Sequence, residues 1–355
     1  MSRLQKLRAE LDRENLDAVL VSKPVNVRYF SGFTGDSTIL IIGRRHKILV
    51  TDGRYDDQAR LESPGFEIVK HEDGLIKKIS DRLKALGFID IGFEGDVVTF
   101  NEYSRLQKFL PDGNFKSLKL DPLRQIKDAD EITLIRRACD IADRAFAEVL
   151  NYIRAGVREI DIAAQLEHLM RQYGSERPAF ETIVASGVRG SLPHGRATEK
   201  VIADGEFVTM DFGAVFNGYH SDMTRTVMVG RANDDQRRLY NILLDAQLCG
   251  LSGIRAGVSG RDVDKKVRDF LGSADLEKYF THGLGHGVGL EIHEEPRLSK
   301  LSDCGALRPN MVVTDEPGIY IPNAFGLRIE DTVIVTDGEA QPLTHSPKHL
   351  IELNN

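Results

Sequence analysis

The stretch FVTMDFGAVFNGYHSDMTRTVMV, residues 207 to 229, organises the larger part of this chain. Its first arm alternates apolar and polar residues up to Phe212, and its second arm is a β-branched and apolar run that begins at Thr224. Both patterns favour β-strands. Between the arms, Asn217-Gly218 is typical of a two-residue hairpin turn. The stretch is therefore predicted to form a β-hairpin.

Two aspartates of this predicted hairpin share one face. With a two-residue loop, Asp211 lies opposite Thr224 and Gly213 lies opposite Asp222, so the two carboxylates sit on a diagonal about 7–8 Å apart at the backbone. Like charges so placed repel. Solvation of an ordinary hairpin face is one explanation, and a shared proton, a basic neighbour or a bound cation is the other.

Composition sets the broad class of the protein. The chain has 355 residues, of which 41% are hydrophobic and 28% charged, as in an ordinary globular protein of up to two domains. A net charge of −7 and a pI near 5.9 argue against a nucleic-acid binder. Charges scattered through the first 21 residues, and the lack of any run of eighteen apolar residues, predict a cytoplasmic protein without a membrane span.

Cysteine contributes little to this chain. Cys139, Cys249 and Cys304 are few, odd in number and widely spaced, so we expect buried free thiols. Neither disulfides nor a cysteine metal cluster are expected.

The first part of the chain, residues 1–122, alternates helical and strand patterns and is expected to be an α/β domain. Its most irregular segment, residues 29–35 (YFSGFTG), is expected to be a loop whose aromatics pack in the core rather than contact a ligand. The helices are expected at residues 3–14, 54–61, 75–86 and 101–109, and the strands at 18–21, 38–42, 47–51, 67–69, 89–93 and 115–119.

The pattern changes after Asp121-Pro122, and we place a second domain at residues 123–355. Asp128 and Glu131 resemble a capping box, followed by apolar residues at helical spacing that extend to Gly156. A second helix is expected to follow and to end before Gly174.

An internal repeat lies within this second domain. Residues 153–157 (IRAGV) recur letter for letter at residues 254–258, VTMDFG is echoed by VTDEPG at residues 313–318, and DMT is echoed by EDT at residues 330–332. The copies lie roughly one hundred residues apart and in the same order. We therefore expect an α+β domain of two pseudo-twofold halves, each with helices on one side of a largely antiparallel sheet. Glu316 and Glu330 would then join Asp211 and Asp222 in one cleft.

The segment THGLGHGVGL, residues 281–290, has glycine at every second position from 283 to 289. So much glycine disfavours a helix, since each residue costs about 1 kcal/mol relative to alanine. We expect an extended strand that carries His282 and His286 on one face and whose bare glycine edge admits backbone or ligand.

Four carboxylates and one or two histidines form an oxygen-rich site suited to Mn²⁺, Co²⁺ or Zn²⁺. Their charge is too large for a single cation, so two bridged divalent ions are expected, with a water of lowered pKa between them as nucleophile. His194 and His293 each lie beside or near a proline and a ligand segment. They suit stabilisation of a tetrahedral intermediate and proton transfer.

These motifs resemble peptidase family M24, the pita-bread metallopeptidases, and within it the Xaa-Pro branch of aminopeptidase P and prolidase. YFSGFTG and TDGRY at residues 51–55 are similar to the creatinase-type N-terminal domain, and the remainder is similar to the catalytic domain. The shared catalytic motifs are DFG…GYHSDMTRT, HGLGHGVG, EPGIY and GLRIED. The resemblance implies a creatinase-like α/β domain at 1–122 and a pita-bread catalytic domain at 123–355.

The resemblance also implies roles for individual residues. The implied metal ligands are Asp211 on one ion, His286 and Glu316 on the other, and Asp222 and Glu330 bridging both. Glu316 is also a candidate to take a proton from the nucleophilic water. His194, His282 and His293 match substrate-handling and proton-shuttling histidines, and Arg328 matches an arginine that supports the site or the substrate.

The expected reaction is hydrolysis of the bond between an N-terminal residue and proline in a peptide, with Mn²⁺ as the first choice among the three metals. This bond is a tertiary amide without an N–H, which ordinary peptidases handle poorly. A homodimer is expected from the resemblance. The alternative is a non-catalytic protein that binds peptide ends on the same fold, but such relatives tend to lack ligands that this chain retains.

Two departures from the family pattern stand out. Ala197 occupies a position at which the family often has proline, so the His194 loop is open to a different shape. Asp315 precedes Glu316 where an apolar residue is more usual. It is expected to face solvent or a helix on the opposite side of the strand, and a fifth metal-site carboxylate is the less favoured reading. His220 is expected to hydrogen-bond in the polar cleft.

Overall fold

The computed structural model describes residues 1–353, and the chain divides into two compact units between Arg124 and Gln125. The 3-10 turn η1 (Asp121–Arg124) belongs to the first unit because the Arg124 guanidinium is buried there and donates to Asn26 Oδ1 at 2.9 Å. No helix within the described range is long and apolar enough to cross a membrane.

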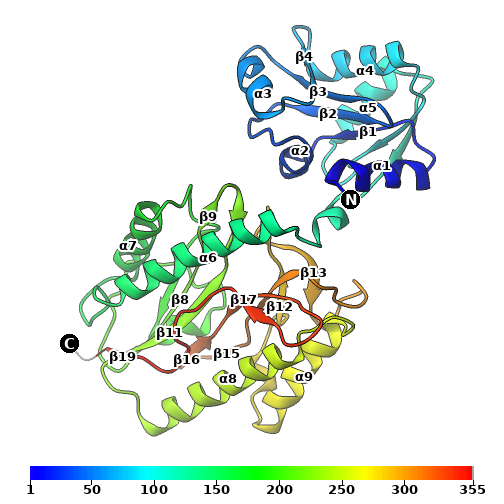
Figure 1. The fold of residues 1–355 in the computed structure, drawn as a ribbon. Coiled ribbons are helices and arrows are strands. Elements are labelled where there is room, and N and C mark those ends of the chain that lie inside the picture. Colours follow the sequence, from blue (N-terminus) through cyan, green and yellow to red (C-terminus); the bar gives the residue numbers. More distant parts are fainter. Residues whose placement is uncertain (354–355) are drawn as a thin grey trace. The chain divides into compact units, whose positions relative to one another are not determined.

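The first unit is an α/β domain with a six-stranded mixed sheet in the order β4-β3-β2-β1-β5-β6 (Figure 1). Strands β1, β2 and β3 are almost entirely buried, which explains their near-continuous apolar sequences. Its elements are α1 (Arg3–Arg13), β1 (Ala18–Val21), α2 (Pro24–Ser31), β2 (Ile39–Gly43), β3 (Lys47–Thr51), α3 (Asp56–Glu62), β4 (Glu67–Lys70), α4 (Leu75–Leu86), β5 (Asp90–Phe93), α5 (Phe100–Phe109) and β6 (Asn114–Ser117).

The segment YFSGFTG is not wholly a loop, which corrects the sequence-based prediction. Tyr29 and Phe30 lie in α2, which begins at Pro24 and ends where Gly32 takes a left-handed φ of 82°. The side chains of Tyr29, Phe30 and Phe33 are buried, so core packing is the correct expectation for the aromatics.

The second unit contains two halves, each with a helix pair packed on a largely antiparallel sheet. The first half contains α6 (Ala129–Val149), α7 (Glu159–Gln172), β7 (Ile183–Ser186), η2 (Gly187–Ser191), β8 (Phe207–Phe212), β9 (Val215–Phe216), β10 (Tyr219–His220) and β11 (Met223–Val229). The sheet order is β19-β11-β8-β7, because the C-terminal strand β19 (Glu352–Leu353) pairs in parallel with β11.

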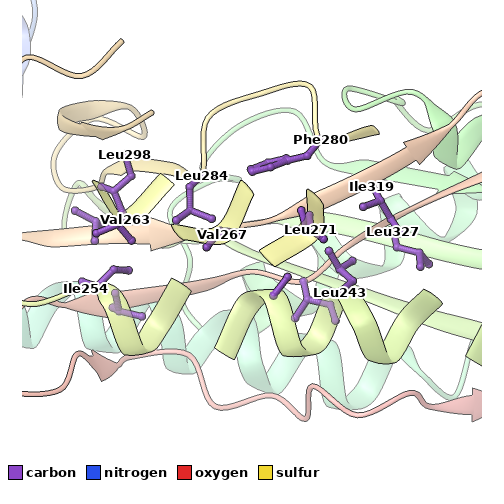
Figure 2. Close-up of a cluster of buried hydrophobic side chains, with 14 of the residues drawn as sticks. Leu243, Ile254, Val263, Val267, Leu271, Phe280, Leu284, Leu298, Ile319 and Leu327 are labelled. Carbon is purple, nitrogen blue, oxygen red and sulfur yellow. The ribbon is translucent and has the colours of Figure 1, made fainter. Parts of the chain in front are cut away.

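The second half contains α8 (Asp234–Gly253), α9 (Gly260–Ser273), η3 (Glu277–Tyr279), β12 (Gly285–Gly287), β13 (Glu294–Leu298), β14 (Val312–Asp315), β15 (Gly318–Ile321), β16 (Phe325–Arg328), β17 (Asp331–Ile334) and β18 (Gln341–Pro342). Its main sheet has the order β13-β12-β14-β17-β18, and β15 pairs with β16 separately. Figure 2 shows Leu243 of α8 and Leu271 of α9 among the buried side chains that hold the helices to the strands, near Ile319 and Leu327.

The two halves repeat in backbone detail, which confirms the expected pseudo-twofold domain. After α6 and after α8 the chain turns through Gly156 and Gly257, whose φ angles are 89° and 86°. The Gly156 N–H donates to the carbonyl of Ile202, and the Gly257 N–H donates to that of Leu307, each at 2.9 Å. The recurring IRAGV segment is therefore the same helix-to-helix connection in both halves.

Helix α6 begins as predicted and ends earlier. Asp128 and Glu131 form the expected capping box. The helix stops at Val149 rather than continuing to Gly156, because the next residues form turns that lead into the left-handed glycine. Apolar spacing continues past the helix end because Ile153 is still buried in the core.

Candidate active site

The hairpin of residues 207–229 has the predicted register. Asp211 pairs with Thr224 across β8 and β11, and Phe216 pairs with Tyr219 at the tip. Asn217 and Gly218 both have positive φ angles, 45° and 74°, which two-residue turns of this kind require. The hairpin therefore presents Asp211 and Asp222 on one face, as expected.

The second half supplies Glu316 and Glu330 from equivalent positions. Glu316 directly follows β14, and Glu330 directly precedes β17, which pairs with β14. The backbone N–H of Glu330 donates to the carbonyl of Thr224 at 3.1 Å. This bond ties the two half-domains together at the point where their carboxylates meet.

His286 lies on a strand shorter than predicted. Strand β12 covers only Gly285–Gly287, with a register shift at its end, so the expectation of one extended strand through His282 is wrong. The glycines act as expected. A Cβ on Gly285 would lie 2.1 Å from the carbonyl oxygen of Thr314, and one on Gly287 would lie 2.5 Å from that of Glu295. The bare edge thus admits two neighbouring backbones.

The residues that the sequence singled out converge on one cleft of about 490 Å³ within the second unit. The His286 Nε2 atom lies 3.4 Å from a carboxylate oxygen of Asp222 and 3.4 Å from one of Glu316. Ligand atoms of Asp222, His286 and Glu330 lie within 4.8 Å of one another. The cleft is lined by all nine predicted site residues: His194, Asp211, Asp222, His282, His286, His293, Glu316, Arg328 and Glu330.

Burial and mutual repulsion make Asp222, Glu316 and Glu330 hard to ionise. Burial raises the pKa of Asp222 to about 6, with the charge of Asp211 adding to the effect. Burial also raises the pKa of Glu316 to about 7, with a contribution from Asp222, and raises that of Glu330 well above its ordinary value. Positive charge in the cleft would therefore stabilise the ionised form of these carboxylates.

His286 is oriented to supply a ligand atom. Its backbone N–H donates to Thr314 Oγ1 at 3.1 Å, and its Nδ1 lies 3.0 Å from the carbonyl oxygen of Gly287. An Nδ1–H donated to that carbonyl leaves the Nε2 lone pair facing the carboxylates. Without metal, burial alone would lower the pKa of His286, but a hydrogen bond from the protonated Nε2 to Asp222 and the charge of Glu316 raise it.

The donor set fits divalent metal ions. Asp211 Oδ1 and Glu330 Oε1 are buried and accept no hydrogen bond from any residue in the range 1–353. Buried carboxylate oxygens without a partner are costly unless a cation satisfies them. Four carboxylates and one imidazole form the hard, mixed oxygen and nitrogen set that Mn²⁺, Co²⁺ and Zn²⁺ accept.

Arg328 is buried beside the carboxylates. Its guanidinium donates to Asp211 Oδ2 at 2.5 Å, to Thr224 Oγ1 at 3.0 Å and to the carbonyl of Pro193 at 3.2 Å. Burial would lower the pKa of Arg328, but Tyr320 and Asp211 raise it well above its ordinary value. It therefore stays charged, orients Asp211 and contacts the His194 loop.

His282 has both ring nitrogens engaged. Nδ1 lies 2.8 Å from the carbonyl of Gly283, and Nε2 lies 2.8 Å from the hydroxyl of Tyr320, which itself accepts a hydrogen bond from Arg328 at 2.7 Å. The consistent assignment is a neutral ring with Nδ1–H donating and Nε2 accepting from Tyr320. Burial, helped by the charge of Arg328, lowers the pKa of His282 to about 4.

His194 and His293 lie at the cleft on segments outside the strands. His293 directly precedes β13, and its ring centroid lies 4.3 Å from that of His286. Burial and the neighbouring His286 lower the pKa of His293 to about 4. His194 lines the cleft from an exposed position after η2.

Several hydrogen bonds within the cleft are not predictable from the sequence motifs. Thr224 donates to Glu330 Oε2 at 2.6 Å while it accepts from Arg328, so it joins two site residues. Tyr320 joins His282 to Arg328. The hairpin pattern places Thr224 opposite Asp211, so its position near the site was predictable. The position of Tyr320 depends on the pairing of β15 with β16, which no sequence pattern indicates.

Asp315 and His220 lie beside the cleft rather than in it. Asp315 is fully buried and accepts from Gln247 of α8 at 3.3 Å, so the expected helix contact is correct and the expected solvent exposure is wrong. Burial and Asp331 raise the pKa of Asp315 well above its ordinary value. The His220 N–H donates to the carbonyl of Gly289 at 2.8 Å, which anchors the segment before His293.

Comparison with known proteins defines the class. Residues 133–337 match metallopeptidase family M24, and residues 3–126 match the creatinase/prolidase N-terminal domain. The first match covers more than half of the chain, which therefore belongs to metallopeptidase family M24, as its motifs indicated. Membership implies that the protein is a peptidase dependent on divalent metal ions.

Individual relatives resemble the chain over its whole length. A Xaa-Pro dipeptidase of Pyrococcus furiosus is 40% identical over 98% of this chain and 99% of its own length. The solved structure of a Xaa-Pro dipeptidase from Bacillus anthracis is 43% identical with a TM-score of 0.96, covering 99% of both chains. An X-Pro aminopeptidase structure from Thermotoga maritima is 37% identical with a TM-score of 0.92, covering 99% of this chain and all of that one.

Proposed function

We propose that this chain is a metal-dependent exopeptidase that hydrolyses the bond between the N-terminal residue of a peptide and a proline in second position. The observation that carries the proposal is the convergence of four carboxylates, His286, Arg328 and three further histidines on one cleft. Relatives named Xaa-Pro dipeptidase and X-Pro aminopeptidase support this substrate class.

We propose two divalent ions per chain, with Mn²⁺ first and Co²⁺ or Zn²⁺ as alternatives. Asp211 would hold one ion, and His286 with Glu316 the other. Asp222 and Glu330 would bridge them. The two partnerless oxygens, Asp211 Oδ1 and Glu330 Oε1, and the Nε2 atom of His286 support this assignment. When bound, such ions supply Lewis-acid activation of water and of the scissile carbonyl.

The other residues of the cleft handle substrate and protons. Glu316, whose pKa burial raises to about 7, suits receipt of a proton from the nucleophilic water near neutral pH. His194 and His293 line the cleft from segments outside the strands. His293, whose ring is neutral near pH 7, suits donation of a hydrogen bond to the developing oxyanion, and His194 suits protonation of the prolyl nitrogen. His282 suits a positioning role rather than direct contact with substrate, because both of its ring nitrogens already have hydrogen-bond partners within the chain.

Arg328 has a supporting role in this proposal. It donates simultaneously to Asp211, to Thr224 and to the backbone of the His194 loop. It therefore links a proposed metal ligand to a substrate-handling segment, and its hydrogen bond holds the Asp211 carboxylate in position.

The test is to strip the protein with a chelator, reload it with Mn²⁺, Co²⁺ or Zn²⁺, and compare Xaa-Pro dipeptides with Xaa-Pro-Xaa tripeptides. Release of the N-terminal residue is expected with at least one metal, and the ratio of the two rates decides between dipeptidase and aminopeptidase. No hydrolysis of either substrate with any metal would refute the proposal. Binding without cleavage would favour a protein that recognises peptide ends.

A single substitution tests the proposed bridging ligand. Asp222→Asn keeps the shape of the side chain and removes its charge, so turnover is expected to fall below detection while circular dichroism stays unchanged. Near-normal turnover would show that Asp222 does not bridge the ions.

Two further expectations complete the proposal. We propose that the chain acts as a homodimer, which rests on the family resemblance, and a monomeric sedimentation profile would contradict it. We also propose a cytoplasmic location, which is compatible with the Xaa-Pro dipeptidase relatives.

A further inference from the structure

The loop that carries His194 is tied at both ends to one buried carboxylate. Ser186 ends β7 and Thr198 lies beyond the loop, so we name residues 187–197 the His194 loop. Glu159, the first residue of α7, is fully buried and lies between these two ends. Nothing in the proposed reaction uses Glu159, which leaves its position to be explained.

Each carboxylate oxygen of Glu159 accepts hydrogen bonds from one end of the His194 loop. Oε1 accepts from the backbone N–H of Ser186 at 2.8 Å and from its hydroxyl at 2.9 Å. Oε2 accepts from the backbone N–H of Thr198 at 3.2 Å and from its hydroxyl at 2.9 Å. A carboxylate with four such donors holds two chain segments at a fixed separation.

Arg189 adds a cross-brace from within the loop. Its guanidinium donates to Glu159 Oε2 and, at 2.7 Å, to the carbonyl of Arg196. The first and last parts of the loop are thereby joined through one side chain. On the cleft side, Arg328 donates to the carbonyl of Pro193, next to His194.

The internal repeat shows that this clamp is specific to the first half. The residue equivalent to Glu159 in the second IRAGV copy is Gly260, the first residue of α9. A Cβ there would lie 2.2 Å from the carbonyl of Arg297 in β13, which leads away from His293. The second half therefore closes this gap by direct backbone contact, whereas the first half fills it with a carboxylate.

We infer that Glu159 is a positioning residue that sets the place of His194 in the cleft by clamping both ends of its loop. This inference rests on the proposed function, because His194 matters only if the cleft cleaves peptides. The alternative is a purely structural role, in which Glu159 only stabilises the start of α7, where a negative charge is favourable. The two readings predict different responses from the loop.

The variant Glu159→Gln separates the two readings. An amide in this place presents an NH₂ group to donors at one end of the loop, so that end is expected to detach. Hydrogen exchange in the metal-free protein should accelerate at least tenfold for the amides of Ser186 and Thr198 and stay unchanged in α8 and α9. For metal-loaded protein, kcat on an Xaa-Pro dipeptide should fall about 10- to 100-fold, with KM changing less than threefold.

The matched control is Glu199→Gln, the same change on an exposed carboxylate next to Thr198 that pairs only with Arg158 among the described residues. It should keep exchange and kcat within twofold of the starting protein. If Glu159→Gln does not fold, Thr198→Val removes one of the clamping bonds from a half-buried position and should give a smaller loss in the same direction.

Each outcome is decisive. Unchanged exchange of the Ser186 and Thr198 amides, or unchanged kcat per metal-loaded chain, would overturn the inference. A purely structural role would lower the melting temperature and the folded fraction while leaving kcat per folded chain unaltered. Absence of hydrolysis by the unmodified protein would refute the proposed function instead, and the exchange measurement would still decide whether Glu159 clamps the loop.

Discussion

Replacing Glu330 with Gln is expected to change stability in opposite directions with and without metal. Glu330 is buried, its Oε1 has no hydrogen-bond partner within residues 1–353, and burial with the charge of Asp222 raises its pKa well above 4.5. A folded-state pKa above the unfolded value means that the carboxyl opposes folding once the pH rises above about 4.5, and increasingly so until the folded pKa is passed.

The magnitude follows from the cost of burying an unpaired charge. Desolvation of a buried ion costs several kcal/mol even after the protein relaxes around it. Gln forfeits part of the hydrogen bond that Glu330 accepts from Thr224, which costs about 1 kcal/mol. At pH 8, metal-free Glu330→Gln should therefore be more stable than the unmodified protein by about 1–3 kcal/mol. For a domain of this size that raises the melting temperature by roughly 2–12 °C.

Metal should reverse the order. At a free concentration of about 100 times Kd, one bound ion stabilises the native state by about 2.7 kcal/mol, and the unmodified protein should gain this for each site. The variant lacks a bridging ligand and should gain much less, so the two melting curves should cross as metal is added. Differential scanning calorimetry with and without chelator measures both effects.

The control for this experiment is Glu339→Gln, which removes an exposed carboxylate nearby in the sequence. It should alter neither melting temperature by more than about 1 °C, as expected of a surface substitution. A metal-free Glu330→Gln protein that melts below the unmodified one, or equal stabilisation of both by metal, would refute the electrostatic reasoning.

Two further substitutions test the surroundings of the cleft. Arg225→Met should destabilise the protein by about 3–5 kcal/mol in a urea titration, because the fully buried guanidinium donates to Asp331 and to carbonyls of the C-terminal segment. The control Arg237→Met removes a half-exposed ion pair and should cost less than about 1 kcal/mol. Equal losses of stability in the two variants would contradict this expectation. Gly260→Ala should destabilise the protein, because the new Cβ would lie 2.2 Å from a carbonyl of β13. In the same helix, Gly272→Ala meets no atom nearer than 3.9 Å and should stabilise the protein by about 0.5–1 kcal/mol. The reverse order of stability would show that the close contact at Gly260 is absent.

The hairpin of residues 207–229 could be predicted because local rules fix it. The Asn217-Gly218 turn sets the register, and alternation then decides that Asp211 and Asp222 share a face. The repeat extends this local result to Glu316 and Glu330 without any knowledge of long-range packing. This is why sequence alone reached most of the cleft.

What sequence reasoning missed depends on packing between distant segments. Helix α2 combines a β-branched and aromatic sequence that favours strands, yet Pro24 starts a helix whose residues fill the core of the first unit. Strand β12 is short because its pairing with β13 shifts register between His286 and Gly287. Likewise, no periodicity identifies the Glu159 clamp, because its partners lie 27 to 39 residues away, within the His194 loop and at its two ends.

The two-ion site is tested by the number of metal ions that cleavage needs. Chelator-stripped protein should be titrated with Mn²⁺ while bound metal and release of proline from an Xaa-Pro dipeptide are measured together. Binding should saturate at two ions per chain, and activity should rise with the second. Saturation of both binding and activity at one ion, or full activity without metal, would contradict it.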